Sequence, residues 1–127
     1  MENNFEKERQ MNDLNSVLLE GNLTRDPEST VTKGWTTLCT FSIGVNRQYK
    51  IEDEKKEEVS FFEIETWGRL AENCFEYLSK GRGVRVVGRL KQSRWENDGK
   101  SYSKVVIIAE HVEFKPIPSV QKEKSGE

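Results

Sequence analysis

Basic and aromatic side chains share one face of a segment in the second half of the chain. Between residues 84 and 95 the sequence VRVVGRLKQSRW alternates as a half-buried β-strand does. Its apolar face carries Val84, Val86 and Leu90. Its other face carries four side chains able to contact a ligand: Arg85, Arg89, Lys91 and Trp95. Val87 is the apolar exception on this face.

Charge is concentrated around this segment. Residues 80–104 include eight basic and two acidic residues, a local balance of +6, although the net charge of the whole chain is −2. A solvated basic face that binds nothing is the alternative explanation. Trp95 argues against it, because exposing an indole among charges brings no structural benefit. The face therefore predicts a binding surface.

Three further aromatic residues lie on polar faces. Alternation over residues 59–67 places Phe61 and Trp67 beside two carboxylates, and Tyr49 follows Arg47 at the end of an earlier strand. Unpaired nucleobases stack on such rings at roughly 1–3 kcal/mol per base, while cations contact the phosphates. A duplex hides those base faces. We therefore expect the four rings to line one groove for single-stranded nucleic acid, with little sequence preference.

The elements that must position these residues follow from periodicity. Strands are predicted over residues 16–24, 38–45, 59–67, 84–95 and 102–114, and a helix over 70–78 with Gly81 ending it. Residues 51–58 are interpreted as a solvated hairpin loop or an exposed strand extension. Asn97-Asp98-Gly99 is typical of a hairpin turn. This order predicts an all-β fold, a five-stranded OB-fold barrel with one helix between its third and fourth strands.

Length and composition predict one domain over residues 14–115, between a disordered extension (1–13) and a short flexible tail (116–127). No signal sequence or membrane span is present, so we expect a soluble cytoplasmic protein. Cys39 and Cys74 match no metal or redox motif and are interpreted as buried, with a disulfide as the minor alternative.

Catalytic chemistry is not predicted. With His111 as the single histidine, we expect no catalytic triad, no metal site and no cofactor. The carboxylates between Glu52 and Glu58 could suggest a metal-dependent nuclease. Lys55 and Lys56 interleave with them, which favours a solvated loop. A non-catalytic interaction module with weak DNA affinity remains the alternative to a DNA-binding protein.

Four motifs, in order, resemble the bacterial single-stranded DNA-binding proteins. They are GNLTRDPE from Gly21, FSIGVNRQY from Phe41, WGRLAENCFEYLSKG from Trp67 and VRVVGRLKQSRW from Val84. The resemblance implies an OB-fold homotetramer that coats single-stranded DNA in replication, recombination and repair, at the nucleoid. It places the stacking rings at Tyr49, Phe61, Trp67 and Trp95, and backbone contacts at Arg69, Lys80, Lys91 and Arg94. Arg85 and Arg89 are predicted from the strand pattern alone, and Arg47 from its place beside Tyr49 at the end of a strand.

The chain departs from the family pattern at several positions. Glu63 stands where a basic residue is common, and Tyr49 where tryptophan is usual. The sequence stops at Glu127 without the family's acidic tip, so recruitment of replication and repair proteins by that route is doubtful. Trp35 has no assigned family role, and DNA contact, subunit contact and local packing all stay open for it.

Overall fold

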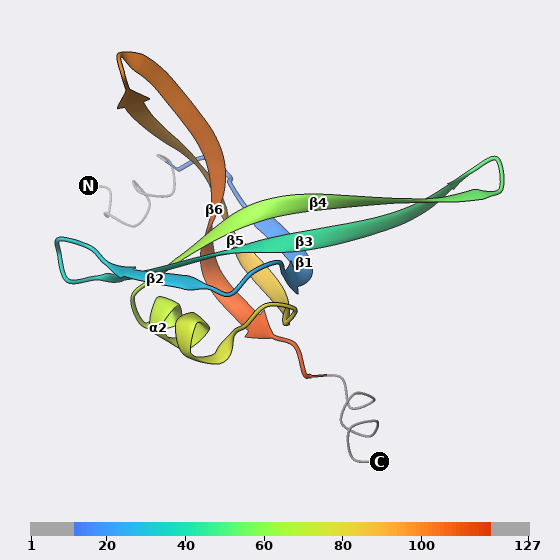
Figure 1. Ribbon diagram of the computed structural model, residues 1–127, viewed down its shortest axis with the longest axis horizontal. Coiled ribbons are helices and arrows are strands. Elements are labelled where there is room, and N and C mark those ends of the chain that lie inside the picture. Colours follow the sequence, from blue (N-terminus) through green and yellow to red (C-terminus); the bar gives the residue numbers. More distant parts are fainter. Residues whose placement is uncertain (1–11, 118–127) are drawn as a thin grey trace, which may run out of the picture.

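Five strands close into a barrel in the computed structural model of the protein, which describes residues 12–117 (Figure 1). A sixth short strand, β2, adds to the outside of β3. The elements are β1 (Val17–Leu23), β2 (Glu28–Val31), β3 (Thr37–Ile51), β4 (Glu54–Trp67), α2 (Gly68–Tyr77), β5 (Gly83–Asn97) and β6 (Lys100–Phe114). The predicted OB-fold is confirmed. Most of the extension and tail predicted at the two ends lies outside the described residues.

Pairing between the first and third strands closes the barrel. The strand order is β1-β5-β6-β4-β3-β2, and β1 also pairs with β3 at Asn22 and Leu23. Strands β4 and β6 meet in parallel at Ile64 and Ile107. Gly21 lies where β1 approaches β3 so closely that a Cβ atom would come 2.5 Å from a backbone oxygen of β3. Only glycine fits this closure without displacing the backbone.

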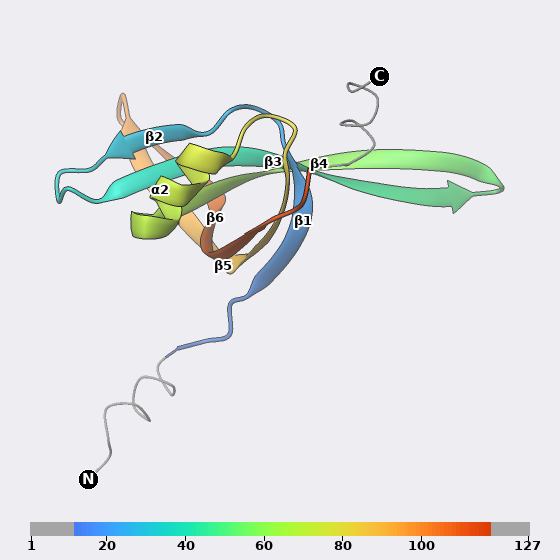
Figure 2. The ribbon, with the colours of Figure 1, turned by 90° about the horizontal axis from the view of Figure 1, so that it is seen from below.

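Side chains from every barrel strand fill the core. Phe41, Ile43, Ile64, Val84 and Val86 are fully buried, as the alternation of their strands predicts. Helix α2 packs against β3 and β4 and contributes buried apolar residues to the same cluster (Figure 2).

The two cysteines are free and buried in this core. Burial raises the pKa of Cys39, and it raises the pKa of Cys74 to about 12, because an apolar environment disfavours the thiolate. Thr66, the buried polar residue beside them, donates a hydrogen bond from its Oγ1 to the carbonyl oxygen of Cys39 at 2.8 Å. The interpretation of both cysteines as buried residues is confirmed.

Two long hairpins project from the barrel in different directions (Figures 1 and 2). We define the β3–β4 arm as residues 46–59 and the β5–β6 arm as residues 90–105. Asp98 and Gly99 turn the second arm with φ values of 52° and 77°, as the Asp-Gly signal predicts. The first arm turns at Glu52 and Asp53, with φ of 50° and 67°. The exposed strand extension, one of two interpretations of residues 51–58, is therefore confirmed.

Some local predictions are wrong. Strand β2 was not predicted, because its four exposed residues carry no alternation. Helix α2 ends at Tyr77, and Gly81 lies in the following loop with φ of 93°, where its N–H donates to the carbonyl oxygen of Leu23. Leu90 is exposed, since it lies where β5 leaves the barrel. No helix in residues 12–117 is long and apolar enough to span a bilayer.

Candidate nucleic-acid interface

Three of the four predicted rings lie on one outer face of the sheet. Phe61 and Trp67 are on β4 and Trp95 is on β5, with exposed fractions of 66%, 39% and 44%. On β4 they alternate with the buried Ile64 and Thr66, so both rings point away from the core.

Strand β6 joins the β4 and β5 parts of this face. In the β4–β6 ladder Glu65 lies beside Ile108, and in the β5–β6 ladder Arg89 also lies beside Ile108. Lys91 lies beside Val106. Cross-strand neighbours point to the same side of a sheet, so these cations share the face with the rings. We call this surface the β4–β6–β5 face, defined by Phe61, Trp67, Arg89, Lys91, Trp95, Tyr102 and Lys104.

Tyr49 does not belong to this face. It pairs with Lys56 on the β3–β4 arm, and it has the same strand phase as the core residues Phe41 and Ile43. Its ring is partly exposed and lies 4.8 Å from the guanidinium carbon of Arg47, a cation–π distance. The expectation of one groove for all four rings is therefore wrong for Tyr49, which forms a separate aromatic site on the arm.

Trp95 stacks on an aromatic residue that sequence analysis missed. The rings of Trp95 and Tyr102 have centroids 5.8 Å apart and planes 19° apart, which is offset stacking. The two residues are cross-strand neighbours in the β5–β6 arm. A two-residue turn at Asp98-Gly99 fixes Asn97 opposite Lys100, and counting outward then brings Trp95 opposite Tyr102. The sequence therefore contained the signal for this pair.

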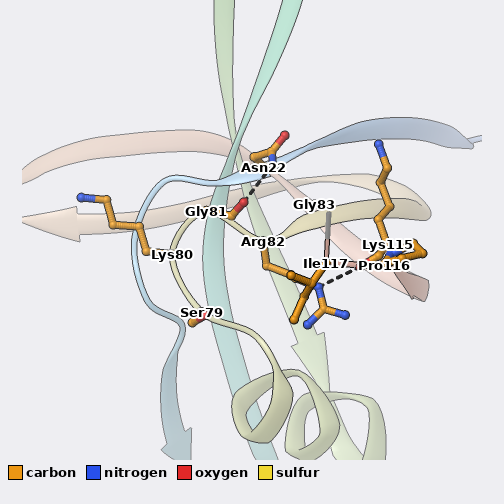
Figure 3. Close-up of a pocket in the computed structure, with 9 residues that line it drawn as sticks. All are labelled: Asn22, Ser79, Lys80, Gly81, Arg82, Gly83, Lys115, Pro116 and Ile117. Atoms are coloured by element: carbon orange, nitrogen blue, oxygen red, sulfur yellow. Dashed lines mark hydrogen bonds between the residues drawn. The ribbon is translucent and has the colours of Figure 1, made fainter. Parts of the chain in front are cut away.

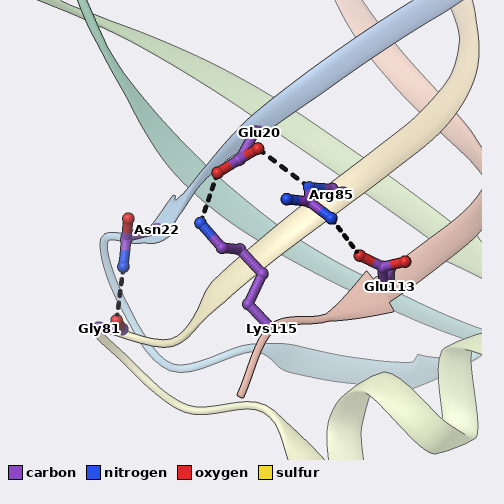
Figure 4. A network of polar contacts seen from close by, with 6 residues as sticks. All are labelled: Glu20, Asn22, Gly81, Arg85, Glu113 and Lys115. Atoms are coloured by element: carbon purple, nitrogen blue, oxygen red, sulfur yellow. Dashed lines mark hydrogen bonds and ion pairs between the residues drawn. The ribbon is translucent and has the colours of Figure 1, made fainter. Parts of the chain in front are cut away.

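Ion pairs modify the predicted charge of the face. The carboxylate of Glu63, which stands where a basic residue is common in the family, accepts a hydrogen bond from Lys104 Nζ at 2.8 Å. Near the start of β5, Arg85 donates to its cross-strand neighbours Glu20 on β1 at 3.0 Å and Glu113 on β6 at 2.8 Å (Figure 4). These contacts raise the pKa of Arg85, chiefly through the bond to Glu20. The pKa of Glu20 is lowered in turn, first by its hydrogen bond from Lys115 and then by Arg85.

Arg85 is therefore a correction to the predicted set of DNA contacts. Its guanidinium already bridges carboxylates from β1 and β6, and a phosphate would have to displace one of them. Arg47 is also paired, with Glu58 at 3.3 Å. Five other predicted cations have no carboxylate within 4.0 Å among residues 12–117: Arg69, Lys80, Arg89, Lys91 and Arg94.

Arg69 lies in the first turn of α2, two residues after Trp67. Gly68 between them has φ of 66°, a conformation that glycine adopts without strain. The first turn holds no acidic residue, and no side chain caps the helix at Trp67. The ring of Trp67 is thus next to free helix N–H groups and a cation, a combination suited to a phosphate beside a stacked base.

Lys80 belongs to a different part of the molecule. It lines a hollow of about 510 Å³ between the β1 end and the start of β5, together with Arg82 and Lys115 (Figure 3). The three cationic side chains extend in different directions, and Arg82 Nε donates to the carbonyl oxygen of Lys115 at 2.8 Å. The positive charges around the hollow therefore do not meet at one point.

Within the part of the chain that the structure describes, no three His, Cys, Asp or Glu residues are placed to hold a metal ion. The rings of the β4–β6–β5 face can stack on flat aromatic bases, and its cations can contact phosphates, so the face can bind an anionic polymer that carries such bases.

Comparisons with known proteins agree with this geometry. A model of the Single-strand binding protein family matches residues 14–115. The Single-stranded DNA-binding protein of Treponema pallidum (strain Nichols) is 50% identical over 104 residues, 82% of this chain and 59% of the relative. That of Aquifex aeolicus (strain VF5) is 44% identical over 100 residues, 78% of this chain and 68% of the relative. The chain thus spans about three fifths of the length of the Treponema relative.

Solved structures show the same fold. The structure titled "Plasmodium falciparum SSB complex with ssDNA" superposes with a TM-score of 0.75, covers 83% of this chain and 97% of that chain, and is 23% identical, so it supports the fold alone. A deletion mutant of the single-stranded DNA binding protein from Thermus aquaticus superposes with a TM-score of 0.73 at 30% identity, covering 81% of this chain and 51% of that chain.

Proposed function

Because the chain belongs to the single-strand binding protein family, we propose that it binds single-stranded DNA through base stacking and backbone contacts, without chemistry. The observation that carries the proposal is the β4–β6–β5 face, where three exposed rings share a surface with unpaired cations. Every base has a π face, so binding is tolerant of sequence. Such binding would protect and organise unpaired DNA during replication, recombination and repair, in the cytoplasm at the nucleoid.

The residues divide into two groups by their setting. Phe61, Trp67 and Trp95 stack bases on the face, and Tyr49, whose ring lies against the paired Arg47, extends the contact onto the β3–β4 arm. Phosphates are contacted by the cations without carboxylate partners: Arg69, Lys80, Arg89, Lys91 and Arg94. Arg85 is left out of this set, since its donors are committed to Glu20 and Glu113.

Tryptophan fluorescence tests the proposal directly. Addition of poly(dT) is expected to quench the emission strongly, because bases stack on the partly exposed Trp67 and Trp95. A duplex of matched length is the control, and it should quench far less since its base faces are hidden. A DNA-independent interaction module would leave the emission nearly unchanged by poly(dT), and that result would refute the proposal.

We further propose that four identical chains assemble. Strand β1 pairs with β3 only at Asn22 and Leu23, so its edge is open over the preceding residues, and Leu18 is exposed there. An open strand edge next to an apolar side chain favours pairing with another chain. Light scattering is expected to give about four times the 14.8 kDa mass of one chain. A monomer at working concentration would rule the assembly out.

A further inference from the structure

Trp35 is the most exposed aromatic side chain of the described residues. It lies in the turn between β2 and β3, and 88% of its surface is exposed. Local packing, one of the three roles open to it from sequence, is therefore excluded. A large indole in water lowers solubility without stabilising the fold, so a ligand or partner is the remaining explanation.

The backbone holds this ring in an unfavourable conformation. Trp35 has φ of 64°, in the left-handed region that bulky residues avoid and glycine favours. Glycine is present one position earlier, at Gly34, where no φ in that region is needed. Residues kept in such conformations cluster at ligand-binding sites, where their contribution to binding offsets the energetic cost of the strained backbone.

Hydrogen bonds fix the turn that presents the ring. Trp35 N–H donates to the carbonyl oxygen of Thr32 at 2.9 Å, and Thr32 N–H donates to that of Thr36 at 2.9 Å. The Thr32 hydroxyl donates to the same Thr36 oxygen at 3.1 Å. Lys33, within the turn, is exposed and has no carboxylate within 4.0 Å among residues 12–117. The turn thus offers an indole and a cation in a constrained geometry.

The turn lies beyond Trp67 along the direction of β4. Trp67 is the cross-strand neighbour of Leu38, and Trp35 comes three residues before Leu38, so that at most about 11 Å of chain separates the two. Both views show the β2–β3 hairpin projecting past the start of α2 (Figures 1 and 2). Phe61, Trp67 and Trp35 therefore follow one another toward this end of the molecule.

We propose that Trp35 is an additional stacking ring, which takes an unpaired nucleobase beyond Trp67 while Lys33 contacts the adjoining phosphate. The inference rests on the proposed single-stranded DNA binding and lengthens its path past the barrel. A strand too short to pass Trp67 would not reach the turn, so the effect of Trp35 depends on the length of the DNA.

Substitution of the strained residue by glycine separates binding from folding. Trp35→Gly suits the φ of this position, so its thermal midpoint should match or exceed that of the parent chain. Its affinity for long oligo(dT) should fall roughly 5- to 150-fold, the loss of one stacked base. Trp35→Asn is a second variant, because asparagine also tolerates this conformation. Trp35→Tyr keeps a ring and should keep most of the affinity.

A length series of oligo(dT) and light scattering complete the test. Val31→Ala, which trims an exposed apolar side chain on the same hairpin, is the matched control and should change nothing. A loss confined to long oligonucleotides supports the inference. Equal binding by parent and Trp35→Gly at every length overturns it, as does a loss that accompanies dissociation of the assembly. Failure of the parent chain to bind oligo(dT) would refute the proposed function itself.

Discussion

Trp95→Ala is expected to lower the affinity for single-stranded DNA by about 1–3 kcal/mol, whatever the base composition. One side of the indole packs on Tyr102, and the ring remains 44% exposed, which leaves a surface for a base. The loss is measured by titration with poly(dT), poly(dA) and poly(dC). Stacking has little dependence on base identity, so an effect restricted to one polymer would contradict this model.

Three companion variants identify what Trp95 supplies. Trp95→Phe keeps a ring and should recover most of the affinity. Tyr102→Ala should weaken binding, because the indole loses the ring that holds its orientation. Tyr102→Phe should not, because the stack is made by the ring and not by the hydroxyl. Equal losses in Tyr102→Phe and Tyr102→Ala would show that the hydroxyl, and not the stack, matters.

Binding is also expected to weaken by about 100-fold per chain between roughly 50 mM and 200 mM salt. Each phosphate neutralised on a single strand contributes about −0.7 to the slope of log K against log salt, so five unpaired cations give about −3.5. The slope is obtained from fluorescence titrations at several salt concentrations. A slope near zero would remove the proposed phosphate contacts.

Two residues of β5 provide a matched pair for this experiment. Lys91→Gln should reduce the steepness of the slope by about 0.7, because it removes one phosphate contact. Arg85→Gln should leave the slope nearly unchanged, because its guanidinium is held by Glu20 and Glu113. Both changes remove one positive charge from the same strand. If the two slopes changed equally, only net charge would be acting, and the division into paired and unpaired cations would be wrong.

Alternation predicted the parts of the face that lie within single strands. The phases of Phe61 and Trp67 on β4, and of Arg89 and Lys91 on β5, follow from residue types alone. Tyr49 was misplaced because its strand was expected to stop at Val45. The phase of the core residue Phe41, continued along all of β3, would have put Tyr49 on the other side.

Contacts between distant segments could not be predicted in this way. Arg85 finds its carboxylates 65 and 28 residues away, on strands whose register depends on closure of the barrel. The pairing of β6 with β5 shifts by one residue opposite Val87 and Gly88, so the next core-facing residue of β6 after Ala109 is Val112 and not His111. No residue type in this part of the sequence indicates the shift. The turn at Glu52-Asp53 lacks the Asn or Gly that marks such turns.

The two arms have a consequence for how the length of the bound DNA can change. Each arm is a self-contained antiparallel ladder, while β4 and β6 pair with each other only at the barrel, at residues 64–65 and 107–108. Removing or inserting two cross-strand pairs near the tip of an arm keeps every remaining side chain on the same face of the ladder. Removing or inserting a single pair moves the side chains beyond it to the opposite face. A protein with this fold can therefore lengthen or shorten an arm by two cross-strand pairs at a time without changing the barrel.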